Sequence, residues 1–170
     1  QSLQLLVNSV GNLKEDFPAA FNAARRILLE GLDSEYLGVR YTAIKGVLAL
    51  PRNYASDDLV VDKLIGLLAS SDELLVTKAA GALGELRVTK AVKPLMERFA
   101  SIEENQDPPS AEYESNGQGE LNQARLAIAE AVGEITNIDR SLRRQMNKAG
   151  VLEQYQALLK WWEANKSNYE

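Results

Sequence analysis

Apolar residues recur at helical spacing along most of the chain, and three segments repeat one pattern. Segments 39–50, 75–86 and 124–135 align without a gap, and the apolar positions of the first are Val39, Ala43, Val47 and Leu50. This spacing places the apolar residues on one face of an α-helix. Its recurrence is typical of a solenoid, in which each unit buries its face against its neighbours.

The breaks between the predicted helices contain residues that begin or end helices. Asp16 and Pro18 suit the start of a helix, because aspartate caps free amide groups and proline fits the first turn. Pro51 ends the first aligned helix, because proline cannot continue it. Counting the aligned segments as helices, we predict an all-α chain with further helices at about 2–10, 17–31, 57–68, 89–100 and 150–165.

Two stretches carry a family resemblance. Residues 32–50 and 70–99 resemble HEAT repeats of the short type found in the phycobilisome-lyase-like group, whose second helix reads roughly Val-Arg, paired alanines and Ala-Leu-Gly. Arg40 and Arg125 stand where that pattern has arginine, and Val76 departs from it. The resemblance implies an α-α superhelix (HEAT/armadillo-like solenoid) of antiparallel helix pairs, right-handed, with the second helices lining its concave side.

We expect a single solenoid domain over residues 1–170. It comprises an N-terminal capping helix (1–16), three helix-pair repeats (17–136) and C-terminal capping helices (137–170). In the last helix a stripe of Leu152, Tyr155, Leu159 and Trp162, flanked by Val151, Leu158 and Trp161, is expected to face the stack. Trp161 and Trp162 then seal the last repeat; the alternative is an aromatic shelf for a ligand or partner.

Four glycines lie inside the aligned helices: Gly46, Gly81, Gly84 and Gly133. Each costs up to about 1 kcal/mol of helix stability relative to alanine, so their presence needs a reason. We expect that they allow neighbouring helices to approach closely. The alternative is direct contact with the backbone of a ligand.

An acidic insertion at 101–120 interrupts the third repeat between its two helices. It contains acidic residues and no basic one, and the rest of the chain is nearly neutral, so the net charge of −5 belongs to this segment. Its Pro-Pro, Ser, Asn and Gly content predicts a solvated loop, with recognition of a basic partner or a loosely held cation as the alternative. The spacing of an EF-hand is not present.

The composition argues against catalysis. The chain has no histidine and no cysteine, which removes the usual general base, the commonest metal ligand and thiolate chemistry. The lack of histidine also argues against the HEAT-repeat hydroxylases, which hold iron with His-Glu motifs. Gly117 and Gly119 do not form a dinucleotide fingerprint. We expect neither an enzyme nor a bound cofactor or metal.

Charge and hydropathy argue against nucleic acid and the membrane interior as binding partners. The isoelectric point is about 5.0, and the one dense basic stretch is Arg140, Arg143, Arg144 and Lys148, a weak footprint for nucleic acid. Apolar runs are far shorter than the roughly 20 residues that span a bilayer. We expect a soluble protein that does not bind nucleic acid and does not insert into a membrane. Because the chain begins at Gln1, we also expect either a processed product or a designed chain; a signal or lipid anchor could have preceded it, and the compartment, cytoplasmic or extracytoplasmic, stays open.

The expected function is a non-catalytic scaffold or adaptor that binds a protein partner of unknown identity on its concave face. The candidate contacts are the outward positions of the second helices, with Tyr41 as the aromatic anchor: Tyr41, Lys45, Thr77, Lys78, Glu130 and Glu134. Two alternatives stay open. The chain is a lyase- or chaperone-like subunit that handles a chromophore or small ligand, or it is a structural fragment of a larger solenoid.

Overall fold

The computed structural model of the protein describes residues 18–103, 123–137 and 151–169. Within these ranges the chain is all-helical and contains no strand, as predicted. The helices are α2 (Pro18–Leu32), α3 (Leu37–Leu48), α4 (Arg52–Ala55), α5 (Asp58–Leu67), α6 (Glu73–Glu85), α7 (Val92–Glu103), α8 (Gln123–Thr136) and α10 (Val151–Asn165). Short 3-10 turns, η1 (Thr89–Ala91) and η2 (Lys166–Asn168), precede α7 and follow α10.

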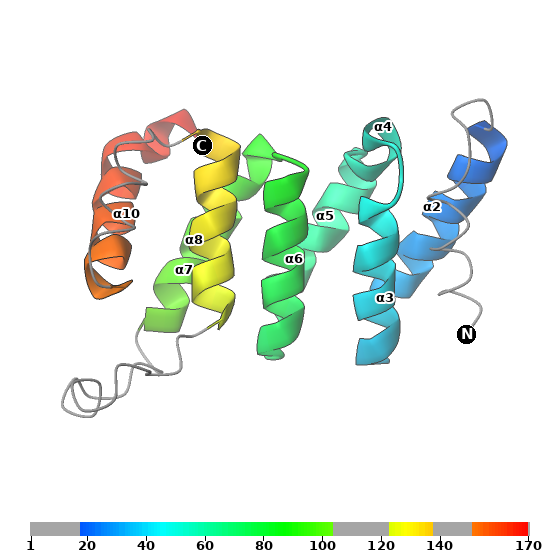
Figure 1. Ribbon diagram of the computed structural model, residues 1–170, viewed down its shortest axis with the longest axis horizontal. Helices are drawn as coiled ribbons and strands as arrows, with labels where there is room; N and C mark the ends of the chain where they lie inside the picture. Colours follow the sequence, from blue (N-terminus) through cyan, green and yellow to red (C-terminus); the bar gives the residue numbers. More distant parts are fainter. Residues whose placement is uncertain (1–17, 104–122, 138–150, 170) are drawn as a thin grey trace.

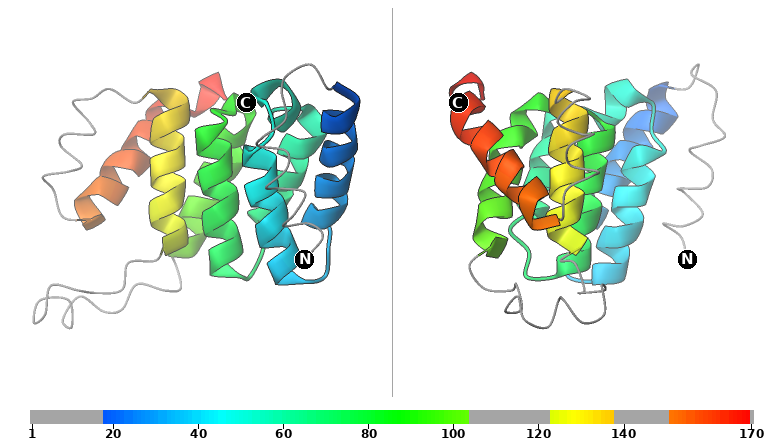
Figure 2. Two further views of the ribbon diagram at one scale, coloured as in Figure 1. Left: turned by 45° about the vertical axis from the view of Figure 1, so that its right-hand side comes forward. Right: turned by 60° about the vertical axis from the view of Figure 1, so that its left-hand side comes forward.

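The helices form two layers. Figure 1 shows α3, α6 and α8 side by side and nearly parallel in front, with α2, α5 and α7 behind them. Contacts join α2 to α3, α5 to α6 and α7 to α8, so consecutive helices form pairs. Contacts from α3 to α6 and from α6 to α8 join the pairs in chain order, which the turned views of Figure 2 also show. The three helices that share the repeated pattern therefore occupy equivalent places in one layer.

Several predicted boundaries are confirmed. Asp57 and Asp72 cap α5 and α6: their carboxylates accept hydrogen bonds from the amides of Leu59 at 3.1 Å and Leu75 at 2.7 Å. Pro51 follows the end of α3, and Pro94 lies in the first turn of α7, where its missing donor costs little. Local capping chemistry thus accounts for where these helices begin and end.

The core is built from small and branched apolar residues of both layers. The repeated stripe is buried except at Val39 and Ile135, which are half-buried, and Ala43, Ala79 and Ile128 are each fully enclosed. Phe21 and Phe99 supply aromatic bulk from the rear layer. Burial of this continuous apolar face is the main favourable term in folding, at about 25 cal/mol per Å².

The two arginines of the repeated pattern have different surroundings. Arg40 is half-buried and donates a hydrogen bond to the Ser34 carbonyl at the α2–α3 turn. Arg125 is fully buried, with its guanidinium carbon 4.7 Å from the ring centre of Phe99 and 4.1 Å from that of Tyr155. Arg125 therefore joins α8 to α7 and to α10, which lies at the end of the stack (Figure 1).

The structure corrects three expectations. Helix α7 continues through Glu103, so the first residues of the 101–120 insertion are helical, and Ile102 is buried. A short helix, α4, follows Pro51, where only a break was expected. Among the α10 side chains that the structure describes (155–165), Tyr155 and Leu158 are buried, so Leu158 belongs to the contact stripe and not to its flank.

Trp161 and Trp162 are half-buried, and their ring centres lie 6.1 and 6.2 Å from that of Tyr169. They pack against the core as the sealing interpretation predicts. The expected N-terminal helix, most of the acidic insertion and the basic cluster Arg140, Arg143, Arg144 and Lys148 lie outside the described residues. Among the residues that are described, none of the helices is long and apolar enough to cross a membrane.

Candidate partner-binding site

Helices α3, α6 and α8 expose one continuous set of side chains, which we call the front face. It consists of Tyr41, Lys45, Thr77, Lys78, Gly81, Glu85, Glu130 and Glu134. All six residues predicted as partner contacts belong to it: Lys45, Lys78, Glu130 and Glu134 are exposed, and Tyr41 and Thr77 are half-buried. In the repeated pattern Lys45, Gly81 and Glu130 are equivalent, so a residue without a side chain lies between a cation and a carboxylate.

Tyr41 joins α3 to α6. Its hydroxyl donates a hydrogen bond of 2.7 Å to Oδ1 of Asp72, the same carboxylate that caps α6. This bond to an anion raises the pKa of Tyr41, with smaller contributions from burial and from the negative charge of Asp72. The Lys78 ammonium lies 5.9 Å from the centre of the Tyr41 ring. Tyr41 therefore has a structural role, and its contact with a partner stays a prediction.

Thr77 also makes an internal contact. Its hydroxyl donates to the Glu73 carbonyl one turn earlier in α6, at 2.9 Å. Between α3 and α6, then, the polar side chains Tyr41, Thr77 and Lys78 are engaged with their own surroundings. The α6–α8 side of the face differs, because small residues line it.

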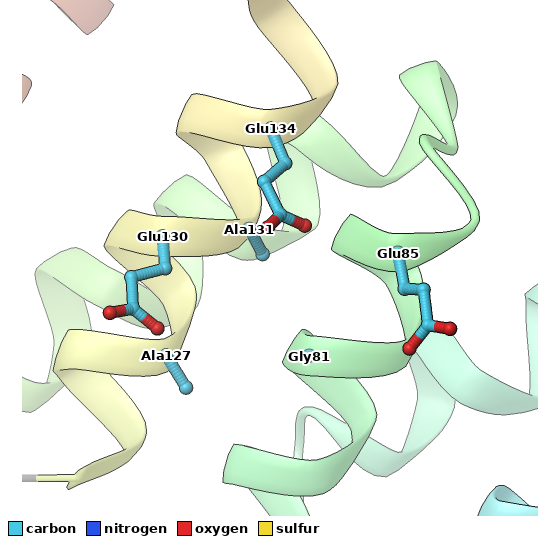
Figure 3. A pocket seen from close by; sticks show the side chains of 6 residues that line it. All are labelled: Gly81, Glu85, Ala127, Glu130, Ala131 and Glu134. Atoms are coloured by element: carbon cyan, nitrogen blue, oxygen red, sulfur yellow. The ribbon is translucent and has the colours of Figure 1, made fainter. Parts of the chain in front are cut away.

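A groove of about 330 Å³ lies between α6 and α8. Its walls are Gly81, Ala127 and Ala131, and the carboxylates of Glu85, Glu130 and Glu134 surround it (Figure 3). One carboxylate comes from α6 and two from α8, where they lie one turn apart. The sequence predicted Glu130 and Glu134 as contacts, but not Glu85 or the groove.

The groove exists because α6 contacts α8 at Gly84 but not at Gly81, less than one turn earlier in α6. A Cβ atom on Gly84 would lie 2.8 Å from Cα and 2.9 Å from Cβ of Ala131, so only glycine fits there. A Cβ on Gly81 would meet nothing within 4 Å. The packing role predicted for these glycines is therefore correct for Gly84 and wrong for Gly81. Gly81 opens the surface because α8 opposite it presents only the small side chains of Ala127 and Ala131.

The carboxylates of the groove differ from those of the rear layer in their partners. In the rear layer Lys90 pairs with Asp58 at 2.7 Å and Asp62 at 2.9 Å, and Arg25 pairs with Asp57 at 2.6 Å. Within the part of the chain that the structure describes, Glu85, Glu130 and Glu134 form no ion pair. The groove therefore presents negative charge that is free to interact with another molecule.

The groove is lined by carboxylates and small residues. In the described ranges no group of three or more metal-ligating side chains is close enough to hold an ion. Three surface carboxylates around a hollow with Gly and Ala walls favour an organic cation over an apolar ligand, since exposed carboxylates keep an apolar group in contact with charge and water. Comparison of the chain with protein-family models and with curated protein sequences finds no match to either.

Proposed function

We propose that this protein is a non-catalytic HEAT-like solenoid that binds a protein partner through its front face. The fold part of the proposal is supported by the three helix pairs stacked in chain order and by the equivalent places of α3, α6 and α8. Solenoids of this kind present an extended surface built from equivalent positions in successive repeats. The front face is such a surface.

One observation carries the functional part. The groove between α6 and α8 lies on the front face, is surrounded by Glu85, Glu130 and Glu134, and is covered by no other described segment. Protein surfaces with a hollow and unpaired charges are typical of sites where another chain completes the contacts. The same carboxylates disfavour the alternative of an apolar chromophore, which needs a largely apolar pocket.

The test is a quantitative pull-down from lysate of the source organism, with the wild-type chain compared with two charge variants. Glu130→Lys with Glu134→Lys reverses charge on the front face, and Glu97→Lys, at an exposed position of α7, is the matched rear-layer control. We expect a protein that wild type and control retain equally and that the front-face variant loses. A partner that all three retain equally would contradict the proposed face, and so would a partner lost with the control alone.

A further inference from the structure

We propose that the groove between α6 and α8 accepts an arginine side chain from an extended segment of the partner. This inference rests on the proposed function and names the chemistry of the partner at that site. Its starting point is charge complementarity: three carboxylates with no ion pair in the described chain surround one hollow.

The arrangement of the carboxylates favours a guanidinium over an ammonium group. Glu85 lies on α6, and Glu130 and Glu134 lie on α8; in Figure 3 the Glu134 side chain points toward α6, whereas the Glu130 carboxylate lies over α8. A guanidinium has five N–H donors in a fixed plane and can bond to carboxylates on more than one side, whereas an ammonium is a compact point charge. Charge-assisted bonds of this kind are roughly twice as strong as neutral ones.

The walls of the groove fit the rest of an arginine side chain. Gly81, Ala127 and Ala131 offer backbone and methyl groups, against which the aliphatic stem of an arginine packs while its charged end stays near the carboxylates. Because Gly81 has no side chain and open space in front of it, the stem can reach the helix backbone. The volume of about 330 Å³ is that of a small-ligand pocket and not of an extended interface.

The remaining front face suggests how the segment runs. Lys45 is exposed on α3, and the exposed Lys78 of α6 reaches toward α3, with its ammonium 5.9 Å from the centre of the Tyr41 ring. A segment that crosses the front layer therefore meets positive charge over α3 and negative charge at the groove. The partner segment should place its arginine over α6 and α8, and any acidic residue toward α3, because opposite charges across an interface set its orientation.

The experiment is an NMR titration of the ¹⁵N-labelled full chain with three acetylated and amidated pentapeptides. Their sequences are Gly-Gly-X-Gly-Gly, with X as arginine, lysine or citrulline, the last a neutral analogue of nearly the same shape. One arginine should bind with a dissociation constant of about 1 mM, a modest affinity for a contact of this size. We expect shifts centred on the amides of Gly81, Ala127 and Ala131 that are largest for arginine and absent for citrulline.

Two variants connect the shifts to the groove. Gly81→Leu fills the hollow, and Gly66→Leu on α5 is its matched control, because both glycines are exposed in helices and a Cβ added at either would meet nothing within 4 Å. Gly81→Leu should abolish the arginine shifts, and Gly66→Leu should leave them unchanged. Glu130→Gln with Glu134→Gln should weaken binding about tenfold through loss of charge-assisted bonds.

Three results would overturn the inference. The first is equal shifts with the arginine and citrulline peptides, and the second is no shift at about 10 mM arginine peptide, roughly 10 times the expected dissociation constant. The third is arginine-peptide shifts that persist in Gly81→Leu. These results are separate from failure of the proposed function. A pull-down partner that depends on Glu130 and Glu134, together with no arginine binding, would reject the arginine and leave the front face as the binding surface. A pull-down with no front-face partner would reject the function itself, whatever the peptides do.

Discussion

At the scale of single residues, Gly81 and Gly84 of α6 show how strongly the surroundings decide the role of one residue type. They lie less than one helical turn apart, yet a Cβ at one meets open space and at the other meets the backbone of Ala131. The intrinsic cost of glycine in a helix is the same at both places. Only the position of α8 separates them.

Because of this difference, we expect the same substitution at the two glycines to change the free energy of unfolding in opposite directions. Gly81→Ala should raise the free energy of unfolding by up to about 1 kcal/mol, because alanine is the better helix former. Gly84→Ala should lower it by about 1–3 kcal/mol, because the added methyl group forces α6 and α8 apart. Urea denaturation followed by circular dichroism measures both. Equal effects at the two sites would contradict the packing described for Ala131.

A second single-residue prediction concerns the end of α6. Arg87 has φ of 52°, in the left-handed region, and the amides of Arg87 and Val88 bond to the carbonyls of Gly84 and Leu83 at 2.9 and 3.1 Å. These two bonds form a Schellman motif, whose left-handed position glycine normally occupies. Arg87→Gly should therefore stabilise the protein by roughly 1 kcal/mol. Arg87→Ala removes the same side chain without relieving the backbone and should give no such gain, which makes it the control in thermal denaturation.

At the scale of elements, two side chains add specific contacts between helices that already pack together, and one of them also reaches α10. Tyr41 bonds to the carboxylate that caps α6, and Arg125 lies between Phe99 of α7 and Tyr155 of α10. Both contacts involve a charged group placed against an aromatic residue or its hydroxyl. Each fixes the position of one helix relative to the next.

The Tyr41 contact makes a prediction about pH. The pKa of Tyr41 is raised above its ordinary value of 10.0, mainly by the hydrogen bond to Asp72. The folded state therefore favours the protonated phenol, so this contribution to stability is full below pH 10.0 and is lost as pH rises through the folded-state pKa. Asp72→Asn keeps a side-chain oxygen for capping but removes the charge, and should lower the pKa of Tyr41 toward 10.0. A ¹³C NMR titration of the tyrosine ring measures this pKa; an unchanged value would contradict the assigned cause.

The Arg125 contact makes a prediction about the attachment of α10. Arg125→Lys should lower the free energy of unfolding by about 2 kcal/mol, because a buried ammonium cannot stack on two rings as a guanidinium does. Amide hydrogen exchange in α10 should become faster, since Tyr155 loses part of its contact. Arg26→Lys, at an exposed position of α2, is the control and should change neither quantity. Unchanged exchange in α10 after Arg125→Lys would show that its attachment rests on apolar contacts such as those of Leu158, Trp161 and Trp162, and not on Arg125.

At the scale of the whole molecule, the two layers differ in how their charges are used. In the rear layer, ion pairs such as Lys90 with Asp58 and Asp62 connect elements, and the pairing with Lys90 lowers the pKa of Asp58. On the front face the described chain leaves the groove carboxylates without cations. This difference supports the proposal that the groove carboxylates serve recognition, while Tyr41 and Asp72 on the same face join α3 to α6.

The difference predicts that the groove carboxylates are not needed for folding. Glu130 and Glu134 are exposed carboxylates one turn apart on α8, and like charges at this spacing repel each other. Replacing Glu130 with glutamine should therefore raise the free energy of unfolding by a few tenths of a kcal/mol. Chemical denaturation tests this directly. A marked loss of stability would instead make Glu130 part of the folding contacts and would weaken its assignment to recognition.

Much of the helical framework could be predicted from local chemistry. The repeated apolar stripe predicted α3, α6 and α8, because helical spacing of apolar residues is a property of the chain itself. Pro51 marked the end of the first aligned helix for the same reason, since the effect of proline acts within one turn. The outward positions of Lys45, Glu130 and Glu134 followed from the same helical geometry.

The sequence by itself therefore determined the main helices of the two layers and the buried faces of α3, α6 and α8, because both depend on spacing along the chain; it did not predict α4 or the last turn of α7. Tertiary structure alone decided that Gly84 is a contact and Gly81 an opening, that Glu85 joins Glu130 and Glu134, and that Arg125 lies between two rings. These features depend on the distance between helices that are separated in sequence. That distance is set by side-chain volumes on both helices at once, which no single segment contains.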